Sequence, residues 1–288
     1  MTKDKKVPIS LLVPCINEEV NLEKCLKSVP WVMDAFVVDS QSTDRTLKIA
    51  QEFDAKIVQF QYKGGWPKKK NWALENIQFC NEWVLILDAD ECLPPEAEEE
   101  IRKIVSNPNN KHSGYWINRR YFFLGKPLKH AYFPNWNLRL FKHKLGRYEK
   151  ITELNTDSGD NEIHEHVVVK GTTGRLNSVM DHYAFPTIDS FIEKHNRYSN
   201  WEAVVESSAQ DDETALQHGG VKGKRRLRKI FRKLPFRPTL RFLYVYFWQK
   251  GILDGWRGYI FARLHAQYEF LSQAKAKAIL ARRKEARD

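Results

Sequence analysis

The chain has 288 residues, of which 42% are hydrophobic, so it is long enough for one large domain with an appendage and too apolar to be wholly disordered. Its net charge of +11 requires an anionic partner, which is a nucleic acid, an anionic membrane or a phosphorylated ligand. The aromatic content of 12% favours a surface that binds sugars or lipids.

The cysteines and the N-terminus indicate a cytoplasmic protein. The four cysteines lie at no spacing typical of a zinc site, so we expect buried, reduced thiols. The first ten residues contain no apolar stretch of signal-peptide length, and no run of about 18 apolar residues predicts a transmembrane helix.

The first 105 residues alternate between strand-like and helix-like segments. Strands are predicted at 9–14, 35–39, 56–60 and 83–87, and helices at 20–29, 47–53, 67–79 and 94–105. Because strand–helix alternation builds βαβ units, this region predicts an α/β fold with a mostly parallel central sheet.

The pattern changes after residue 114. Short aromatic strands predict a smaller mixed sheet up to residue 182, followed by a helix at 187–207 and a polar linker. The last segment, 240–286, is predicted to be helical. The expected organisation is a catalytic domain over 1–208 (a nucleotide-sugar half at 7–106 and an acceptor half at 107–208), a linker at 209–223 and a basic aromatic helical extension at 224–288.

Acidic residues follow the predicted strand at 83–87. In open α/β sheets, ligands bind beyond the carboxyl ends of the strands. Asp88 and Asp90 therefore suit Mg²⁺ or Mn²⁺, although a helix-capping role is the alternative. Since the chain has no glycine-rich phosphate loop, side chains and metal must hold a nucleotide. The run Lys68–Lys70 either faces phosphates or is an ordinary solvated run.

Four motifs, in order, carry a resemblance to a known family: ISLLVPCINEE, FVVDSQSTDRT, KKKNWALE and VLILDADE. Together they closely resemble the N-terminal half of the family 2 glycosyltransferases. That resemblance implies an inverting enzyme with the nucleotide-diphospho-sugar transferase (GT-A) fold.

The resemblance also implies roles for individual residues. Asp39 matches the acid that reads the nucleotide base, commonly uracil, which implies a UDP-hexose donor. Asp88 and Asp90 match the metal-binding pair, with Asp90 favoured as the direct ligand. Gln41 replaces the usual glycine, which leaves that turn in doubt. The residues implied to contact the nucleotide-diphosphate sugar are Pro14, Asn17, Glu18, Asp39, Ser42, Asp44, Lys70, Asn71 and Asp88.

The second half is similar to a narrower branch, the heptose β-1,4-glucosyltransferases that build the lipopolysaccharide inner core. The segments behind this are YFPNWNLRLF, IHEHV, MDHY, EKHNRYSNWEA and GILDGWRGYIFA. The implied acceptor is a saccharide or glycolipid, and the alternative acceptors are a polyprenyl phosphate, a capsule glycan or a protein.

An inverting transfer needs a base for the acceptor hydroxyl, and Glu165 is the candidate because it lies 75 residues after Asp90, where the family's catalytic acid is expected. A surface carboxylate is the alternative. His182 resembles a histidine metal ligand of such enzymes, with a structural role as the alternative. Residues expected near the acceptor, with strand packing the alternative for the first three, are Trp136, Asn137, Arg139, His164 and His166.

The positive charge is concentrated at the C-terminus. Residues 222–288 contain 19 Lys and Arg against 4 Asp and Glu, a net charge of +15, which leaves −4 for the rest. Basic residues interleaved with aromatic ones suit an anionic membrane surface, so we predict a peripheral protein on the inner face of the cytoplasmic membrane. A solvated helix pair is the alternative. A nucleic-acid-binding protein is disfavoured, because the first half is acidic and no known reading module is present.

Overall fold

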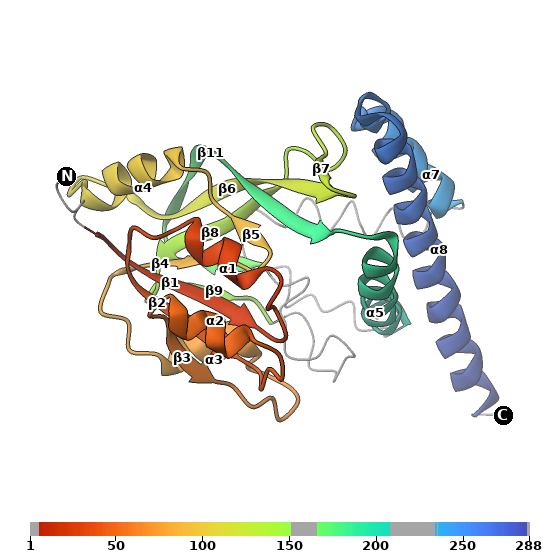
Figure 1. Cartoon of the computed structure of the whole chain (residues 1–288). Helices are drawn as coiled ribbons and strands as arrows, with labels where there is room; N and C mark the ends of the chain where they lie inside the picture. The colour runs from red at the N-terminus through yellow and green to blue at the C-terminus, as the bar shows by residue number, and fades with distance from the viewer. Residues whose placement is uncertain (1–5, 151–165, 208–233, 235, 287–288) are drawn as a thin grey trace. The chain divides into compact units, whose positions relative to one another are not determined.

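A computed structural model describes residues 6–150, 166–207, 234 and 236–286 of the chain (Figure 1). The described residues form two compact units. Those within 1–121, 134–149 and 160–184 belong to the first unit, and those within 122–133, 150–159 and 185–288 belong to the second. The sequence places the helix at 187–207 in the catalytic domain, whereas the structure groups it with the C-terminal helices.

The first unit is built on four parallel strands, as the alternating pattern predicts. They are β1 (Val7–Cys15), β2 (Val32–Asp39), β3 (Lys56–Gln59) and β4 (Trp83–Ile86), in the order β3-β2-β1-β4. Because β1 is paired on both edges and covered on both faces, it reads as a continuous apolar run.

Helices cover both faces of this parallel sheet. They are α1 (Leu22–Lys27), α2 (Thr46–Glu52), α3 (Lys69–Asn76) and α4 (Glu96–Ser106). Alternate residues of β1 point to opposite faces. Leu11 joins the core that contains residues of α1, α2 and α4, whereas Leu12 joins the core that contains residues of α3. The two cores hold the carboxyl ends of β1, β2 and β4 at one edge.

The aromatic strands of the second half extend the same sheet rather than forming a separate one. Among the described residues this sheet has nine strands, and β8 (Trp136–Lys142) joins it by pairing antiparallel with β4. The other added strands are β5 (Glu91–Cys92), β6 (His112–Phe123), β7 (Lys126–Pro127) and β11 (Thr172–Phe185), while β9 (Gly146–Tyr148) and β10 (Val167–Val169) form a small antiparallel pair. The expected α/β fold is confirmed, with its parallel and mixed parts in one sheet.

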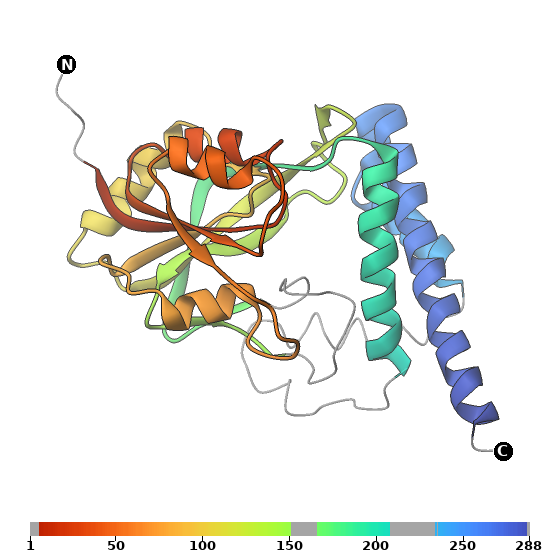
Figure 2. The same cartoon turned by 60° about the horizontal axis from the view of Figure 1, so that its bottom comes forward.

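The second unit is mainly helical. Its elements are α5 (Ile188–Ser207), α7 (Arg237–Leu243), the π-helical turn η2 (Tyr244–Trp248), the 3₁₀ turn η3 (Gly251–Asp254) and α8 (Gly255–Glu285). Helices α5 and α8 pack side by side (Figures 1 and 2). The predicted helical segment 240–286 is interrupted, because Lys250 and Gly255 have φ angles of +57° and +65°. None of the described helices is both long enough and apolar enough to span a bilayer.

Two buried histidines belong to the aromatic core of this second unit. The ring of His195 stacks on Phe191 with centroids 3.7 Å apart, and His265 packs on Phe261 at 4.4 Å. Burial lowers the pKa of His195 to about 4, although its hydrogen bond to the Phe191 carbonyl oxygen opposes this shift. Burial also lowers the pKa of His265 well below its ordinary value. Both rings are therefore neutral in the folded chain.

A neutral, buried histidine makes stability depend on pH. Because the pKa of His195 is lower in the folded chain than in the unfolded one, its contribution is present above about pH 6.5 and is lost as the pH falls. The free energy of unfolding, measured by urea denaturation, should fall between pH 6.5 and 4, by up to about 1.4 kcal/mol per pH unit from this residue. In the variant His195→Gln, the free energy of unfolding should depend less steeply on pH. An equally steep dependence in the variant would contradict the assignment.

Candidate active site

The carboxyl end of β2 carries Asp39, which is fully buried and lies opposite Cys15 of β1. Its carboxylate accepts hydrogen bonds from the backbone N–H of Ser42 at 2.9 Å, from the Ser42 hydroxyl, and from Gln59 Nε2 at 3.1 Å. Gln41 has a φ of +55°, so it adopts the left-handed conformation for which glycine is the usual residue. The turn therefore forms without the glycine.

The loop after β1 is tied to the loop after β2. The backbone N–H of Asn17 donates to Ser42 Oγ at 2.8 Å, and Asn17 Oδ1 accepts from the backbone N–H of Thr43 at 2.8 Å. Further along, the backbone N–H groups of Glu18 and Glu19 donate to Thr46 and Asp44 at 2.8 and 3.1 Å. The structure thus brings Asn17, Glu18, Ser42 and Asp44 together beside the end of β1, where Pro14 lies.

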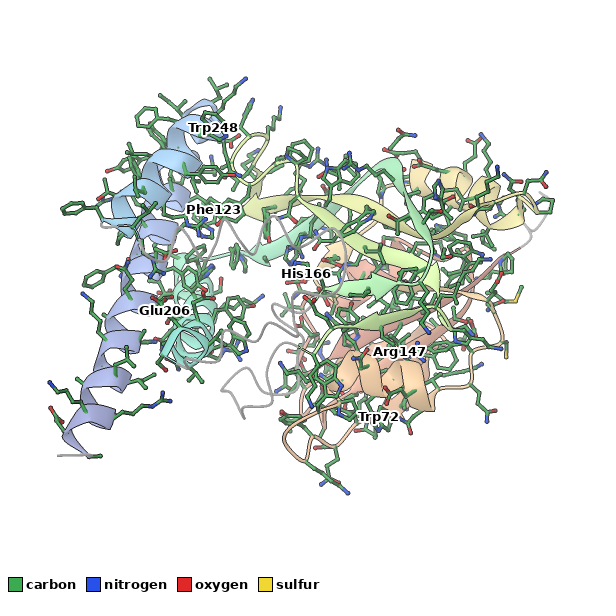
Figure 3. All side chains as sticks on the ribbon, turned by 180° about the vertical axis from the view of Figure 1, so that it is seen from behind. Trp72, Phe123, Arg147, His166, Glu206 and Trp248 are labelled. Carbon is green, nitrogen blue, oxygen red and sulfur yellow. The ribbon has the colours of Figure 1, made fainter. Side chains whose placement is uncertain are left out.

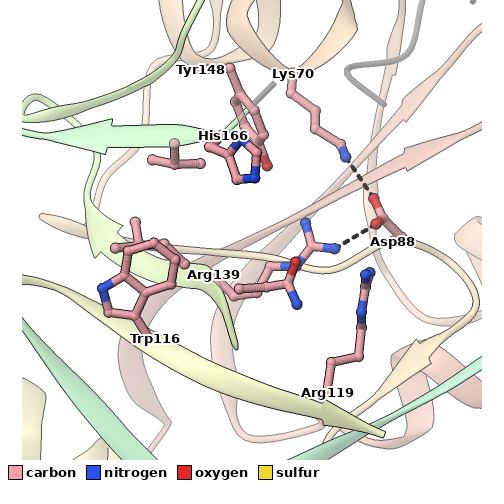
Figure 4. A pocket seen from close by; sticks show the side chains of 10 residues that line it. Lys70, Asp88, Trp116, Arg119, Arg139, Tyr148 and His166 are labelled. Atoms are coloured by element: carbon pink, nitrogen blue, oxygen red, sulfur yellow. Dashed lines mark hydrogen bonds and ion pairs between the residues drawn. The ribbon is translucent and has the colours of Figure 1, made fainter. Parts of the chain in front are cut away.

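A cluster of opposite charges lies beyond the carboxyl end of β4 (Figure 4). Asp88 accepts from Lys70 Nζ at 2.8 Å and from Arg139 Nη2 at 2.6 Å. The same Arg139 nitrogen lies 2.5 Å from Glu91, which is fully buried and also pairs with Arg119 at 3.0 Å. We call Lys70, Asp88, Glu91, Arg119 and Arg139 the charge cluster.

The cations of the charge cluster keep the carboxylate of Asp88 ionised. Burial alone would raise the pKa of Asp88, but the charges of Arg139 and Lys70 outweigh it and hold the pKa well below its ordinary value. Against the effect of burial, Asp88 and Glu91 raise the pKa of Arg139 well above its own ordinary value. Three cations therefore face two carboxylates, which leaves one positive charge in excess.

The lysine run that opens α3 is buried and not a solvated run. Lys69 donates to the carbonyl oxygen of Cys15 at 2.7 Å, and Lys70 reaches Asp88. The side-chain amide of Asn71 both donates to and accepts from the backbone of Tyr148, each at 2.8 Å. Asn71 therefore fixes β9 to α3 beside the charge cluster.

Next to the charge cluster in sequence, Asp90 pairs with His182 of β11. Their Oδ1 and Nε2 atoms are 3.1 Å apart, because β5 and β11 pair antiparallel with His182 opposite Glu91. The other ring nitrogen of His182, Nδ1, is buried without a hydrogen-bond partner. Two ligands of one octahedral Mg²⁺ or Mn²⁺ lie about 3 Å apart, so this pair fits such an ion as two donors. Among the described residues, no group of three His, Cys, Asp or Glu side chains could hold a metal.

A cavity of about 100 Å³ opens on the charge cluster (Figure 4). Of the residues predicted near the acceptor, Asn137, Arg139 and His166 line it, whereas Trp136 is not among the lining residues and stacks with Arg175 at 4.8 Å. The lining residues are Lys70, Asp88, Trp116, Arg119, Asn137, Leu138, Arg139, Tyr148, His166 and Val167.

The predicted base, Glu165, and His164 lie outside the described residues. The next residue, His166, is exposed, and its Nδ1 lies 3.1 Å from the carboxylate of Glu149. The described chain therefore resumes at the cavity directly after Glu165.

Comparison with known proteins identifies the family. The family described as Glycosyl transferase family 2 matches residues 10–161. The lipopolysaccharide core biosynthesis glycosyltransferase LpsC of Rhizobium meliloti is 31% identical over 285 residues, which covers 94% of this chain and 92% of LpsC. The chain belongs to glycosyltransferase family 2. An uncharacterised glycosyltransferase of Rickettsia conorii is 32% identical over 70% of this chain and 72% of its own length.

Solved structures confirm the GT-A-like fold of this family 2 member. The mannosyltransferase PcManGT of Pyrobaculum calidifontis, solved with GDP-Man and Mn²⁺, aligns with 95% of this chain and 88% of its own, with a TM-score of 0.50 and 14% identity. The resemblance seen in the four sequence motifs is thus confirmed at the level of family and fold.

Besides the aliphatic Leu138 and Val167, four charged or aromatic residues of the cavity and cluster were not predicted from the sequence. Glu91, Trp116, Arg119 and Tyr148 come from β5, β6 and β9, and the segments that contain them show only strand-like or acidic patterns. The one available signal was the Asp-Glu continuation of the acidic motif at residues 90–91.

Replacing Arg139 should show how much its ion pairs with Asp88 and Glu91 contribute to the stability of the fold. We expect Arg139→Gln to lower the free energy of unfolding by about 3 kcal/mol at pH 7, because Asp88 and Glu91 each lose a cation. Since the pKa of Asp88 is lowered in the folded chain, the difference in the free energy of unfolding between wild type and Arg139→Gln should become smaller as the pH falls below about 4.

Urea denaturation at pH 7 and at about pH 3.5 measures both effects. Arg120→Gln is the matched control, because Arg120 pairs with Asp181 in a more exposed position and should cost less than about 1 kcal/mol. Equal losses in the two variants would contradict the role given to the cluster.

Proposed function

We propose that this glycosyltransferase transfers a hexose, with inversion, from a nucleotide-diphosphate sugar to a saccharide of the lipopolysaccharide core or another lipid-linked glycan. The observation that carries the proposal is the meeting of Asp88 with Lys70 and Arg139 beyond β4, two residues before the Asp90 carboxylate that pairs with His182. These residues supply oxygen donors for a divalent ion and cations for a diphosphate. The lipopolysaccharide acceptor is supported by the similarity to LpsC over nearly the whole chain.

The donor nucleotide is proposed to lie against the loops after β1 and β2. Asp39 would accept from a uracil N–H, while Asn17, Glu18, Ser42 and Asp44, with Pro14, line the nucleoside site. Because the backbone of these loops is cross-linked by hydrogen bonds, the site is already ordered before the donor binds. Uracil recognition is the basis for preferring a UDP-hexose. Lys70 and Asn71 belong to the diphosphate side.

The proposed metal is Mg²⁺ or Mn²⁺, held by Asp90 and His182. Asp88, the third residue expected to bind it, is paired with Lys70 and Arg139 and does not form a three-residue group with them. When bound, the metal neutralises charge on the departing diphosphate. The chain's own contribution is to place Lys70, 2.8 Å from Asp88, where its ammonium also faces the leaving group.

Glu165 is proposed as the general base. It takes the proton of the acceptor hydroxyl as the new bond to the sugar C1 forms and the bond from C1 to the diphosphate oxygen breaks. Trp136, Asn137, Arg139, His164 and His166 are proposed to orient the acceptor. Residues 222–288 are proposed to bring the enzyme to an anionic membrane surface.

The metal assignment is tested with Asp90→Asn. Nucleotide release from UDP-sugars should fall at least about 100-fold, the equivalent of about 2.7 kcal/mol of lost transition-state stabilisation. The Mn²⁺ concentration for half-maximal rate should rise in His182→Gln. Asp181→Asn is the matched control, since this neighbouring carboxylate pairs with Arg120 and should leave turnover near wild type. Full turnover by Asp90→Asn would overturn the assignment, and GDP- and dTDP-sugars assayed in parallel identify the donor base.

The base assignment is tested with Glu165→Gln. We expect kcat to fall about 1000-fold with the KM of the donor unchanged, because only proton removal is lost. Glu162→Gln, three residues earlier in the same segment, serves as the control and should keep wild-type kcat. Retained transfer by Glu165→Gln, with normal donor binding, would reject the base.

A further inference from the structure

The second unit exposes an unusual number of large apolar side chains near the junction of its C-terminal helices. Eight of the seventeen residues from 243 to 259 are large, apolar or aromatic, and exposed, with Trp248 at 79% and Leu253 at 63%. We call them the tip surface: Leu243, Tyr244, Phe247, Trp248, Ile252, Leu253, Trp256 and Tyr259. Figure 3 labels Trp248 among the side chains that project from this part of the helices.

The spacing of these residues shows that the exposure follows from the helical geometry. The first four occupy positions i, i+1, i+4 and i+5, so they lie on one face of the helical segment that ends at Trp248. Of the last four, Ile252 and Leu253 lie on the 3₁₀ turn, whereas Trp256 and Tyr259 lie three residues apart on the first turns of α8. Val245, between the exposed residues of the first set, is fully buried. The first segment therefore buries one face and presents the other to solvent.

The backbone beneath the tip surface is closely packed. A Cβ atom on Gly258 would lie 1.9 Å from the carbonyl oxygen of Gly251, so the turn at 251–254 rests directly on the first turns of α8. Asp254 fixes the same turn to a neighbouring loop, because its carboxylate accepts from the backbone N–H groups of Lys129 and Ala131, each at 2.8 Å. The exposed side chains thus stand on a fixed support.

The charge of this segment is one-sided. Residues 243–259 contain two cations, Lys250 and Arg257, and one acid, Asp254. The side chain of Asp254 is only 5% exposed, because the loop amides cover it. Lys250 is exposed between the apolar residues Trp248 and Ile252, and Arg257 packs on the ring of Trp256 at 4.4 Å. The segment therefore offers apolar and cationic groups to solvent and almost no carboxylate.

We infer that the tip surface is the element that inserts into an anionic lipid bilayer, with Lys250 and Arg257 at the level of the headgroups. Aromatic side chains flanked by Lys and Arg are the composition that binds the interfacial region of membranes. The inference says which residues would make the membrane contact of the proposed function. It rests only on the proposal that residues 222–288 bind an anionic membrane surface. It assigns insertion to residues 243–259, and leaves the other basic residues of 222–288 to add only long-range attraction.

A second copy of the chain fits this surface less well. In a two-fold symmetric dimer the same patch meets itself, so Lys250 and Arg257 would face their own counterparts. Because the tip segment has almost no accessible carboxylate, nothing there would neutralise the cations. Anionic lipid headgroups supply that neutralisation.

The test is flotation of the full chain with vesicles of phosphatidylcholine alone and with 30% phosphatidylglycerol. Wild type should bind the anionic vesicles and partition at least tenfold more weakly to the neutral ones. The double variant Trp248→Ser, Leu253→Ser keeps every charge and should lower partitioning into anionic vesicles at least tenfold. The matched control is Phe270→Ser, Leu280→Ser, which also removes one exposed ring and one exposed leucine from these helices and should change partitioning less than twofold.

Equal flotation of the tip variant and wild type would overturn the inference, as would an equal loss in the control pair or equal binding of wild type to neutral vesicles. A wild-type dimer in sedimentation velocity that the tip variant converts to monomer, with flotation unchanged, would assign the surface to self-association instead. Release of nucleotide from a soluble donor should be the same in all variants. Because that assay needs no membrane, failure of the glycosyltransfer proposal and failure of this inference give different results.

Discussion

The ion pairs of Arg139 fix how the two halves of the catalytic sheet meet. Arg139 lies on β8, whereas Asp88 and Glu91 follow β4, and β8 pairs antiparallel with β4 through Leu85 and Leu140. Removing one partner of a buried ion pair is costly. A shift of β8 by one residue would turn Arg139 to the other face, which would leave Glu91 with Arg119 alone and Asp88 with Lys70 alone. The register that buries the core is thus also the register that assembles the charge cluster.

The same cluster explains how a site rich in carboxylates serves an anionic substrate. Asp88 and Glu91 hold Lys70, Arg119 and Arg139 in place, and all three cations line the cavity. Fixed cations need no reorganisation when negative charge develops on a leaving group, which is the most effective form of electrostatic stabilisation. The acidic residues orient the cations, and in the proposed function the cations would attract the donor.

Local sequence patterns predicted the helices and strands. Contacts that depend on the pairing of strands distant in sequence could not be predicted. Short apolar runs predicted the four parallel strands, and Asp88 was singled out because it directly follows the apolar run at 83–87. Arg119 and Tyr148 were missed because they reach the cavity only through the pairing of strands distant in sequence. The buried lysines of α3 were ambiguous for the same reason, since a run of three lysines reveals nothing about the carbonyl oxygen of Cys15 or about Asp88. The interruption at Lys250 was hidden because a left-handed lysine has no sequence signature.

The overall charge of +11 combines two kinds of positive charge that differ in what they can do. The cations of the charge cluster are paired with carboxylates and buried, so salt screens them little and they act at short range. Apart from Arg237 and Arg241, which pair with Glu206 and Glu269, the cations of residues 222–288 have few acidic neighbours in sequence, so their attraction to an anionic surface would be long-ranged and salt-sensitive. Attraction of that kind brings a protein to a membrane without fixing its orientation. An apolar surface with a fixed backbone does fix it, so in the membrane binding that we propose the exposed rings at 243–259 set the orientation of the enzyme, and its lysines and arginines set only its approach.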